Sequence, residues 1–210
     1  MTLRKTKSFR SRIHGVNLNE LGIVKKLYSK LNSPKSKNSD KKMDYIYFFS
    51  GKKAFRSLSN FWENDVVIDG RCYQSGEHAF HGEKFFRLGL SGLDRSTELM
   101  DYAAKFMKPS SYTPAMAKKM GGKNGLRLNE EELWRWSKMS IYVQKDICQY
   151  KLRYAEVWDD LIDSKGKLLI HPALRCRTPE KCIWEGRYVD GAVVGGNLLG
   201  KIWMELREPL

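Results

Sequence analysis

The sequence predicts an α+β fold that is mainly helical. Stretches rich in β-branched and aromatic residues are short and few, and the clearest ones lie between residues 45 and 75. Segments with capping residues and helical spacing are longer and fill most of the remaining chain. Of the 210 residues, 41% are hydrophobic and 12% aromatic, which is enough to bury the core of one domain.

The body of the chain begins at Met43 and opens with strand signals. "DYIYFFS" is short, aromatic and β-favouring, so it predicts a strand at 45–49. "VVIDGRCY" predicts a hairpin, because Asp69-Gly70 is a favoured two-residue turn and lies between β-favouring residues. One strand and a two-stranded hairpin are therefore expected before the first helix of the body.

Three helices with start or stop signals follow the hairpin. Ser75 can cap the first, which is expected to run to about Phe86. The second lies within "SGLDRSTELMDYAAKFM" and ends before Pro109. The third opens at Thr113-Pro114, a capping residue followed by proline at the first helical position, and Gly121-Gly122 closes it.

The second half of the body is also expected to be helical at both ends. Asn129 and Glu132 form a capping box before a long helical tract, which runs to about Asp163 with a break near Tyr154. Residues 165–196, with their prolines and glycines, are expected to be loop-like. The closing stretch "NLLGKIWMELRE" is expected to be a helix or a strand.

Most of the positive charge lies in the N-terminal segment. Residues 1–42 carry twelve Lys/Arg and two acidic residues, a net charge of +10. Residues 43–210 carry 26 Lys/Arg and 22 acidic residues, a net charge of only +4. Apolar residues at helical spacing predict an amphipathic helix over 18–31 with Asn17 as its cap. The polar stretch 32–42 is expected to be a linker. Residues 1–42 are thus interpreted as a basic extension and linker.

Three functions of this extension remain open. It can be a basic arm that contacts phosphates, a solvated tail, or an organelle transit peptide, since transit peptides are also basic, serine-bearing and poor in acids. The expected location is intracellular, cytoplasmic or nuclear, with organelle import as the alternative. Protein partners are not predicted.

Membrane, metal and cofactor functions are not indicated. No stretch approaches the roughly eighteen apolar residues of a membrane span. Cys72, Cys148, Cys176 and Cys182 follow no framework spacing, so reduced thiols are expected. His171 together with two of these cysteines has the wrong spacing for the usual zinc sites. No metal and no cofactor are therefore expected.

The stretch "SGEHAFHGEKFF" (75–86) concentrates ionisable residues on a helix. Glu77, His81 and Lys84 are spaced by four and three residues, which places them on one helical face beside aromatic residues. A solvated surface helix with a glutamate in its first turn would explain the pattern without any chemistry. A site that moves protons would explain it as well.

Four blocks of the chain resemble the NADAR, or YbiA-like, N-glycosidase superfamily. They occur in the family's order and span about residues 43–208, and together they are specific although each alone is weak. The blocks are "SLSNFWENDVVIDGRCYQSGEHAFHGEKF" (57–85), Trp134 with Lys138, Trp184 followed by a glycine-bearing loop, and "GNLLGKIWMELRE" (196–208).

The resemblance implies a single YbiA-like domain that cleaves an N-glycosidic bond. Some members act on ribosylamino-pyrimidine intermediates of riboflavin biosynthesis, and others remove ADP-ribose from guanine bases in nucleic acid. The expected function is the second: an N-glycosidase that reverses ADP-ribosylation of guanine in DNA or RNA. The alternatives are the riboflavin-pathway reaction and a non-catalytic module that binds ADP-ribose or nucleic acid.

The resemblance assigns two catalytic residues. Glu77 matches the family's catalytic glutamate, which can protonate a leaving nitrogen or activate water. Lys84 lies two turns further on the same face and is expected to attack the opened sugar as a Schiff-base nucleophile. His78 also matches the family but points elsewhere on the helix, so a structural role is expected.

The remaining site residues are assigned to substrate binding. Trp134 and Trp184 match positions that border the substrate, where flat rings can stack on bases. Gly196 and Asn197 are expected to cradle a phosphate before a helix start. The other tryptophans, among them Trp158, are expected in the core. The further substrate-binding candidates are Asn60, Phe61, His81, Asp190 and Lys201.

The chain also departs from the family pattern. Lys181 replaces an aspartate found three residues before the Trp184 position, and His171 stands where relatives have an acid. Arg175 and Arg177 add positive charge to the same stretch. The identity of a second catalytic acid is therefore open, and the added cations favour a more anionic substrate. This favours an ADP-ribosyl group on nucleic acid over a small ribosyl monophosphate.

Overall fold

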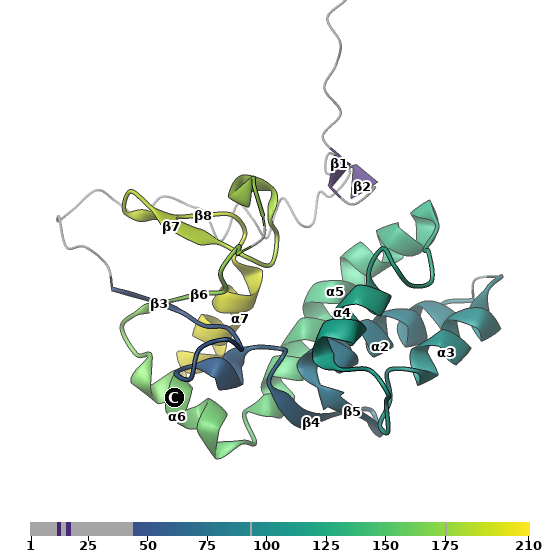
Figure 1. The fold of residues 1–210 in the computed structure, drawn as a ribbon, viewed down its shortest axis with the longest axis horizontal. Coiled ribbons are helices and arrows are strands. Elements are labelled where there is room, and N and C mark those ends of the chain that lie inside the picture. Colours follow the sequence, from purple (N-terminus) through teal and green to yellow (C-terminus); the bar gives the residue numbers. More distant parts are fainter. Residues whose placement is uncertain (1–11, 14–15, 18–43, 93, 175) are drawn as a thin grey trace, which may run out of the picture. The chain divides into compact units, whose positions relative to one another are not determined.

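The computed structural model describes residues 12–13, 16–17, 44–92, 94–174 and 176–210 (Figure 1). The chain divides into two units, Met1–Lys41 and Lys42–Leu210. The described part of the first unit is an antiparallel pair, β1 (Arg12–Ile13) and β2 (Val16–Asn17). The predicted helix 18–31 and linker 32–42 lie outside the described residues, so the interpretation of the extension stays a prediction.

The second unit has the mainly helical α+β fold that the sequence predicts. Its described strands are short and pair two by two, as β3 with β6, β4 with β5 and β7 with β8. The helices are longer and are seen as coiled ribbons around these pairs in Figure 1. They are α2 (Gly76–Gly89), α3 (Ser96–Ala104), α4 (Pro114–Gly121), α5 (Glu130–Lys151), α6 (Ala155–Asp163) and α7 (Leu198–Arg207).

The predicted hairpin is present and leads directly into α2. β4 (Glu63–Ile68) and β5 (Arg71–Ser75) pair antiparallel through a turn at Asp69-Gly70. Both turn residues have positive φ, 47° and 80°, the geometry that favours Asp-Gly in two-residue hairpins. Ser75 then caps α2 by accepting a hydrogen bond from the His78 N–H. The hairpin and the cap thus set the starting position of the helix that carries Glu77.

The other helix signals are confirmed. Thr113 caps α4 by accepting from the Met116 N–H. Asn129 and Glu132 form the expected capping box, with bonds of 2.7 and 2.9 Å in the two directions. The long tract breaks between α5 and α6, where Tyr154 has extended backbone angles.

The expectation of a loop throughout 165–196 is wrong. The segment contains β6 (Leu168–Ile170) and the hairpin formed by β7 (Arg187–Val189) and β8 (Ala192–Val194). β6 pairs in parallel with β3 (Tyr45–Tyr47), more than a hundred residues earlier in the chain. For β6, a three-residue strand with a distant partner leaves little local periodicity in the sequence. β7 and β8 pair locally across Asp190-Gly191, so this hairpin did have a local turn signal, which the interpretation of 165–196 as a loop overlooked.

Two buried clusters stabilise this unit, and α5 contributes to both. The first packs α2 against α3, α5 and the β4–β5 hairpin, with Tyr73, Phe85 and Phe106 fully buried. The second surrounds Trp203 of α7, whose indole N–H donates to the Leu58 carbonyl. Trp158 is 43% exposed, so its assignment to the core is wrong. α6 buries Val157 and Leu161 instead.

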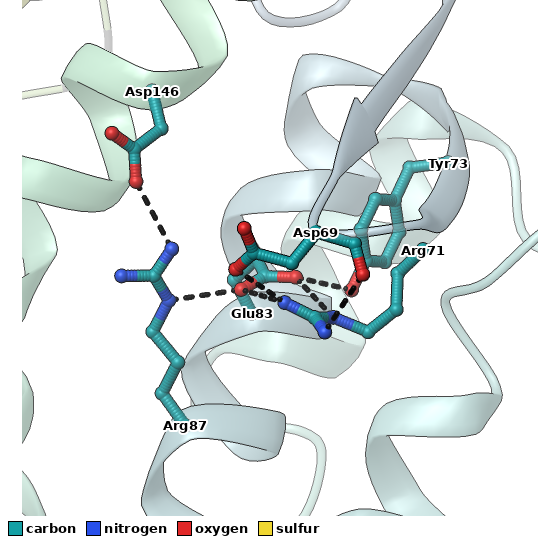
Figure 2. Close-up of polar contacts among 6 residues, drawn as sticks. All are labelled: Asp69, Arg71, Tyr73, Glu83, Arg87 and Asp146. Carbon is teal, nitrogen blue, oxygen red and sulfur yellow. Dashed lines mark hydrogen bonds and ion pairs between the residues drawn. The ribbon is translucent and has the colours of Figure 1, made fainter.

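The inner face of α2 is held by a buried carboxylate, Glu83 (Figure 2). Glu83 accepts hydrogen bonds from Arg71 Nε at 2.7 Å, Tyr73 Oη at 2.8 Å and Arg87 Nε at 2.9 Å. Arg87 also pairs with Asp146 of α5 at 3.0 Å. Burial and the neighbouring negative charge of Glu83 raise the pKa of Tyr73, which stays a neutral donor. Since these partners come from β5, α2 and α5, the network fixes how α2 is seated.

Two of the four cysteines are reduced thiols, as expected, and the other two are not. Cys72 and Cys148 are free, and burial raises the pKa of Cys148 to about 12. Cys176 and Cys182 form a disulfide, so the expectation is wrong for this pair. The short 3-10 turn Pro179–Lys181 lies between the two cysteines in the chain.

Lys151 on α5 is fully buried and is expected to make stability depend on pH. Its ammonium donates to the Ser59 carbonyl at 2.8 Å, and burial lowers its pKa to about 8. Between pH 8 and 10.5 the unfolded chain therefore binds the proton that the folded chain has released, so stability rises with pH. Urea unfolding should show a gain of up to about 3 kcal/mol from this group.

Lys151→Met is the test of this pH dependence. Lys84 has a similarly lowered pKa, so the variant should keep part of the rise in unfolding free energy between pH 8 and 9. Above about pH 9 the raised pKa of Cys148 opposes both lysines, so the comparison is made between pH 8 and 9. An unchanged rise in Lys151→Met would show that Lys151 does not titrate in this range.

Candidate active site

One face of α2 brings Glu77, His81 and Lys84 together, as the spacing predicted. Glu77 and Lys84 are each only 7% exposed. The side chain of His81 is 12% exposed. A solvated surface helix is therefore not what the structure shows. Ionisable groups that are withdrawn from water but still reach the surface are typical of sites that move protons.

Glu77 and His81 are joined by a hydrogen bond. His81 Nε2 lies 3.2 Å from Glu77 Oε1. Burial lowers the pKa of His81, and the bond to Glu77 only partly opposes this, so the imidazole is neutral at pH 7. A neutral ring bonded to a carboxylate carries its proton on Nε2. This tautomer agrees with the surroundings of the other ring nitrogen, because His81 Nδ1 is buried and has no hydrogen-bond partner that would need a proton from it.

Lys84 is held by the end of α4. Its ammonium donates to the carbonyl of Gly121 and lies 4.5 Å from the ring centroid of Phe85. Burial lowers the pKa of Lys84 to about 8. Gly121 also packs on the His81 ring, because a Cβ atom there would collide with it. Gly121 therefore seats two of the three ionisable side chains.

Two further ionisable residues share the electrostatic environment of Glu77. Burial lowers the pKa of His171 to about 4, with the positive charge of Lys118 adding to the effect and Glu77 opposing it. Lys118 Nζ lies 5.4 Å from the Phe61 ring centroid and 3.9 Å from Glu185 Oε1. The sequence marked His171 as a departure from the family. It gave no local signal for Lys118.

Aromatic rings lie beside this face. Phe80 of α2 contacts Trp184 edge-on at 5.4 Å and Trp136 at 5.0 Å between ring centroids. Trp184 is half-buried, as expected of a ring that borders a site. Trp134 is 47% exposed, and the ring contact that the structure gives it is with Lys138, at 5.4 Å. The structure thus brings Trp184 to this face, and the role of the exposed Trp134 stays a prediction.

The predicted phosphate cradle is occupied by the protein itself. The Gly196 N–H donates to the Cys182 carbonyl at 2.7 Å, and the Asn197 N–H donates to the Glu185 carbonyl at 3.1 Å. The Asn197 side chain accepts from the His171 N–H and donates to the Leu169 carbonyl. These groups join the 182–185 loop and β6 to the start of α7. They are not open to a phosphate in this structure.

The other predicted site residues are more dispersed. Asp190 lies in the exposed turn between β7 and β8 with φ of 47°, where Asp190-Gly191 repeats the turn geometry of Asp69-Gly70. Lys201 is half-buried on α7, and burial lowers its pKa. Asn60 is buried and hydrogen-bonded to Gln144.

His78 has two internal partners. Its ring nitrogens lie 2.8 Å from Ser75 Oγ and 2.8 Å from the Tyr112 carbonyl oxygen. Burial lowers the pKa of His78. The histidine thus joins the start of α2 to the segment before α4, which is a structural task.

The basic stretch before Trp184 is exposed where it is described. Arg177 and Lys181 are exposed, and Arg175 lies outside the described residues. Within the ranges that the structure describes, no three His, Cys, Asp or Glu side chains gather in a way that could hold a metal ion. None of the described helices is both long and apolar enough to cross a membrane.

Comparison with solved structures shows a likeness in fold. No family model and no curated protein matches the chain. Among solved structures, it is similar to the NMR structure of the E. coli protein YbiA, with a TM-score of 0.55 and 26% sequence identity. The match covers 79% of this chain and 84% of that one. The chain therefore has the YbiA-like fold of the NADAR superfamily, as its four sequence blocks predicted.

Proposed function

We propose that this protein is an N-glycosidase that removes ADP-ribose from guanine bases in nucleic acid. The observation that carries the proposal is the pairing of a carboxylate and a buried amine on one face of α2. Glu77 can exchange a proton at a ribosyl centre. Lys84, with a pKa of about 8, is partly neutral at physiological pH and can act as a nucleophile.

The proposed mechanism uses both groups. Ribose on an exocyclic amine is an aminal, whose ring opens to a protonated imine when Glu77 delivers a proton to the ring oxygen. Neutral Lys84 adds to C1, a proton passes from its nitrogen to the base nitrogen, and the bond between C1 and the base nitrogen breaks. The base leaves as a free amine and the sugar remains as a Schiff base on Lys84. Water then hydrolyses the Schiff base, releasing the sugar and regenerating the lysine.

His81 and Gly121 support this chemistry in different ways. The hydrogen bond from His81 holds one oxygen of Glu77 in place. The Gly121 carbonyl holds the amine of Lys84. A neutral histidine orients the carboxylate without adding a full positive charge, which leaves Glu77 able to accept and return a proton.

The preference for an ADP-ribosyl group rests on charge. Lys118 lies within the electrostatic environment of the site, and Arg177 and Lys181 lie exposed in the stretch before Trp184. Cations around a site favour an anionic substrate such as a diphosphate or a nucleic-acid strand. The half-buried ring of Trp184 offers a surface on which a base can stack.

The direct test is incubation with two substrates in parallel. One is an oligonucleotide carrying ADP-ribose on guanine, and the other is a ribosylaminopyrimidine phosphate. Release of free ADP-ribose from the first alone would support the proposal. Turnover of the second alone would assign the protein to a riboflavin-type reaction. Tight ADP-ribose binding without turnover of either would favour a binding module.

The basic stretch provides a separate prediction. Arg177→Ala combined with Lys181→Ala should raise KM for the modified oligonucleotide more than KM for ADP-ribosyl-guanosine, because the longer substrate offers more phosphates. Steady-state kinetics at two salt concentrations would measure this, and the salt dependence should flatten as well. Arg153→Ala with Lys165→Ala, two exposed cations near the ends of α6, is the matched control. Equal effects on both substrates would show that the stretch does not follow a strand.

A further inference from the structure

The side chains of Asn60 and Gln144 form a closed amide pair. Asn60 Nδ2 donates to Gln144 Oε1 at 2.7 Å, and Gln144 Nε2 donates to Asn60 Oδ1 at 3.1 Å. Both residues are buried, with exposures of 9% and 2%. Buried amides that satisfy each other in both directions fix their mutual orientation. Asn60 therefore directs its amide into the protein, toward α5, and not toward a ligand.

The backbone of Asn60 touches the start of α2. The Glu77 N–H donates to the Asn60 carbonyl at 2.8 Å. This N–H belongs to the first turn of the helix, whose donors have no partner within the helix. Gly76 allows the approach, because a Cβ atom there would lie 2.7 Å from Asn60 Oδ1 and 3.1 Å from Asn60 Cα. Asn60 thus caps the helix at the residue that carries the catalytic carboxylate.

The residues before Asn60 are anchored separately. The Leu58 carbonyl accepts from Trp203 Nε1 at 2.9 Å, and the Ser59 carbonyl accepts from Lys151 Nζ at 2.8 Å. Neither anchor reaches Asn60 itself. A local turn also spans Asn60, in which the Phe61 N–H donates to Ser59 Oγ and the Trp62 N–H donates to the Ser59 carbonyl, both at 3.2 Å. Gln144 adds the contact that ties the Asn60 side chain itself to α5.

We infer that Gln144 is a positioning residue for the reaction, which holds the Glu77 backbone in place through Asn60. The inference rests on the proposed function, in which Glu77 is catalytic. It replaces the expectation that Asn60 binds substrate. Phe61, next in the chain and facing Lys118, is carried into the site by the same loop.

Gln144→Met is the first test, because methionine is similar in length and removes both hydrogen bonds. Amide hydrogen exchange at Glu77, followed by NMR, should accelerate by about tenfold or more as the cap loosens. With the modified oligonucleotide, kcat should fall by about tenfold or more while KM stays within about twofold, since small misplacements of a reacting group are costly. An unchanged exchange rate at Glu77 would overturn the inference.

Two further variants separate positioning from general destabilisation. Exchanging the pair, Asn60→Gln with Gln144→Asn, preserves the two hydrogen bonds and the combined side-chain length, and should restore both exchange protection and kcat. Ile147→Val removes one buried methyl group from the same face of α5 and should change neither. If Ile147→Val reproduced the loss, or the exchanged pair restored nothing, the inference would fail.

A double variant tests the same inference if Gln144→Met does not fold. Asn60→Leu with Gln144→Met leaves no unpaired amide, which makes such replacements close to neutral for stability. Exchange at Glu77 should still accelerate in this double variant, and normal protection would overturn the inference. Because exchange needs no substrate, an inactive wild-type protein would refute the proposed function and leave this measurement to decide the role of Gln144.

Discussion

Glu77→Gln is expected to lower turnover by at least about a hundredfold, the usual range for losing a general acid or base. Glutamine has the shape of glutamate and can still accept the hydrogen bond from His81 Nε2. The substitution therefore removes the exchangeable proton and leaves the geometry of α2 in place. Ligand affinity should change little. Single-turnover kinetics with the ADP-ribosylated oligonucleotide, together with calorimetric binding of ADP-ribose, would measure both quantities.

His81→Gln is the matched control for this prediction. It lies one turn away and keeps a polar side chain beside Glu77. A much smaller loss of turnover is expected, because His81 orients the carboxylate and exchanges no proton in the proposed mechanism. A Glu77→Gln protein that kept half of its activity would eliminate Glu77 as the catalytic acid.

Borohydride added during turnover is expected to leave a stable sugar adduct on Lys84. The reagent reduces the proposed imine, and the adduct would appear as added mass on one peptide. Lys84→Ala should form no adduct and should turn over much more slowly, whereas Glu77→Gln should form the adduct slowly or not at all. Lys118→Ala removes a different lysine of the same site and should still be trapped on Lys84.

The trapping rate should also depend on pH in a defined direction. Since the pKa of Lys84 is about 8, the neutral, nucleophilic fraction rises about tenfold per unit below pH 8 and levels off above it. The trapping rate should follow the same curve. Direct attack by water at the anomeric carbon predicts no trapped species, and robust wild-type turnover without any adduct would leave Lys84 as a positioning cation.

Much of the local structure was predictable because its causes are local. Asp69-Gly70 supplies the backbone angles of a tight hairpin, and Ser75 and Asn129 supply side-chain acceptors for helix starts. Glu77, His81 and Lys84 share a face because helical geometry alone places them there. These features need no knowledge of the rest of the chain.

The parts that were missed depend on distant partners. Nothing near Asn60 in the sequence indicates that Gln144, 84 positions later, will occupy its amide. The same holds for Lys118, whose approach to the site depends on how α4 packs against α2. Trp158 was placed in the core from its size alone, but the helix it belongs to has only one buried face. Long-range packing decided each of these outcomes.

The network around Glu83 restricts how α2 can rotate about its own axis. Turning α2 by one residue would rotate its side chains by about 100°, which would separate Glu83 from Arg71 and Tyr73 of β5 and Arg87 from Asp146 of α5. A buried carboxylate that lost its β5 partners would then make the rotated helix strongly unfavourable. The orientation of α2 is thus specified on the side away from Glu77. The network thereby limits the directions in which α2 can present Glu77, His81 and Lys84.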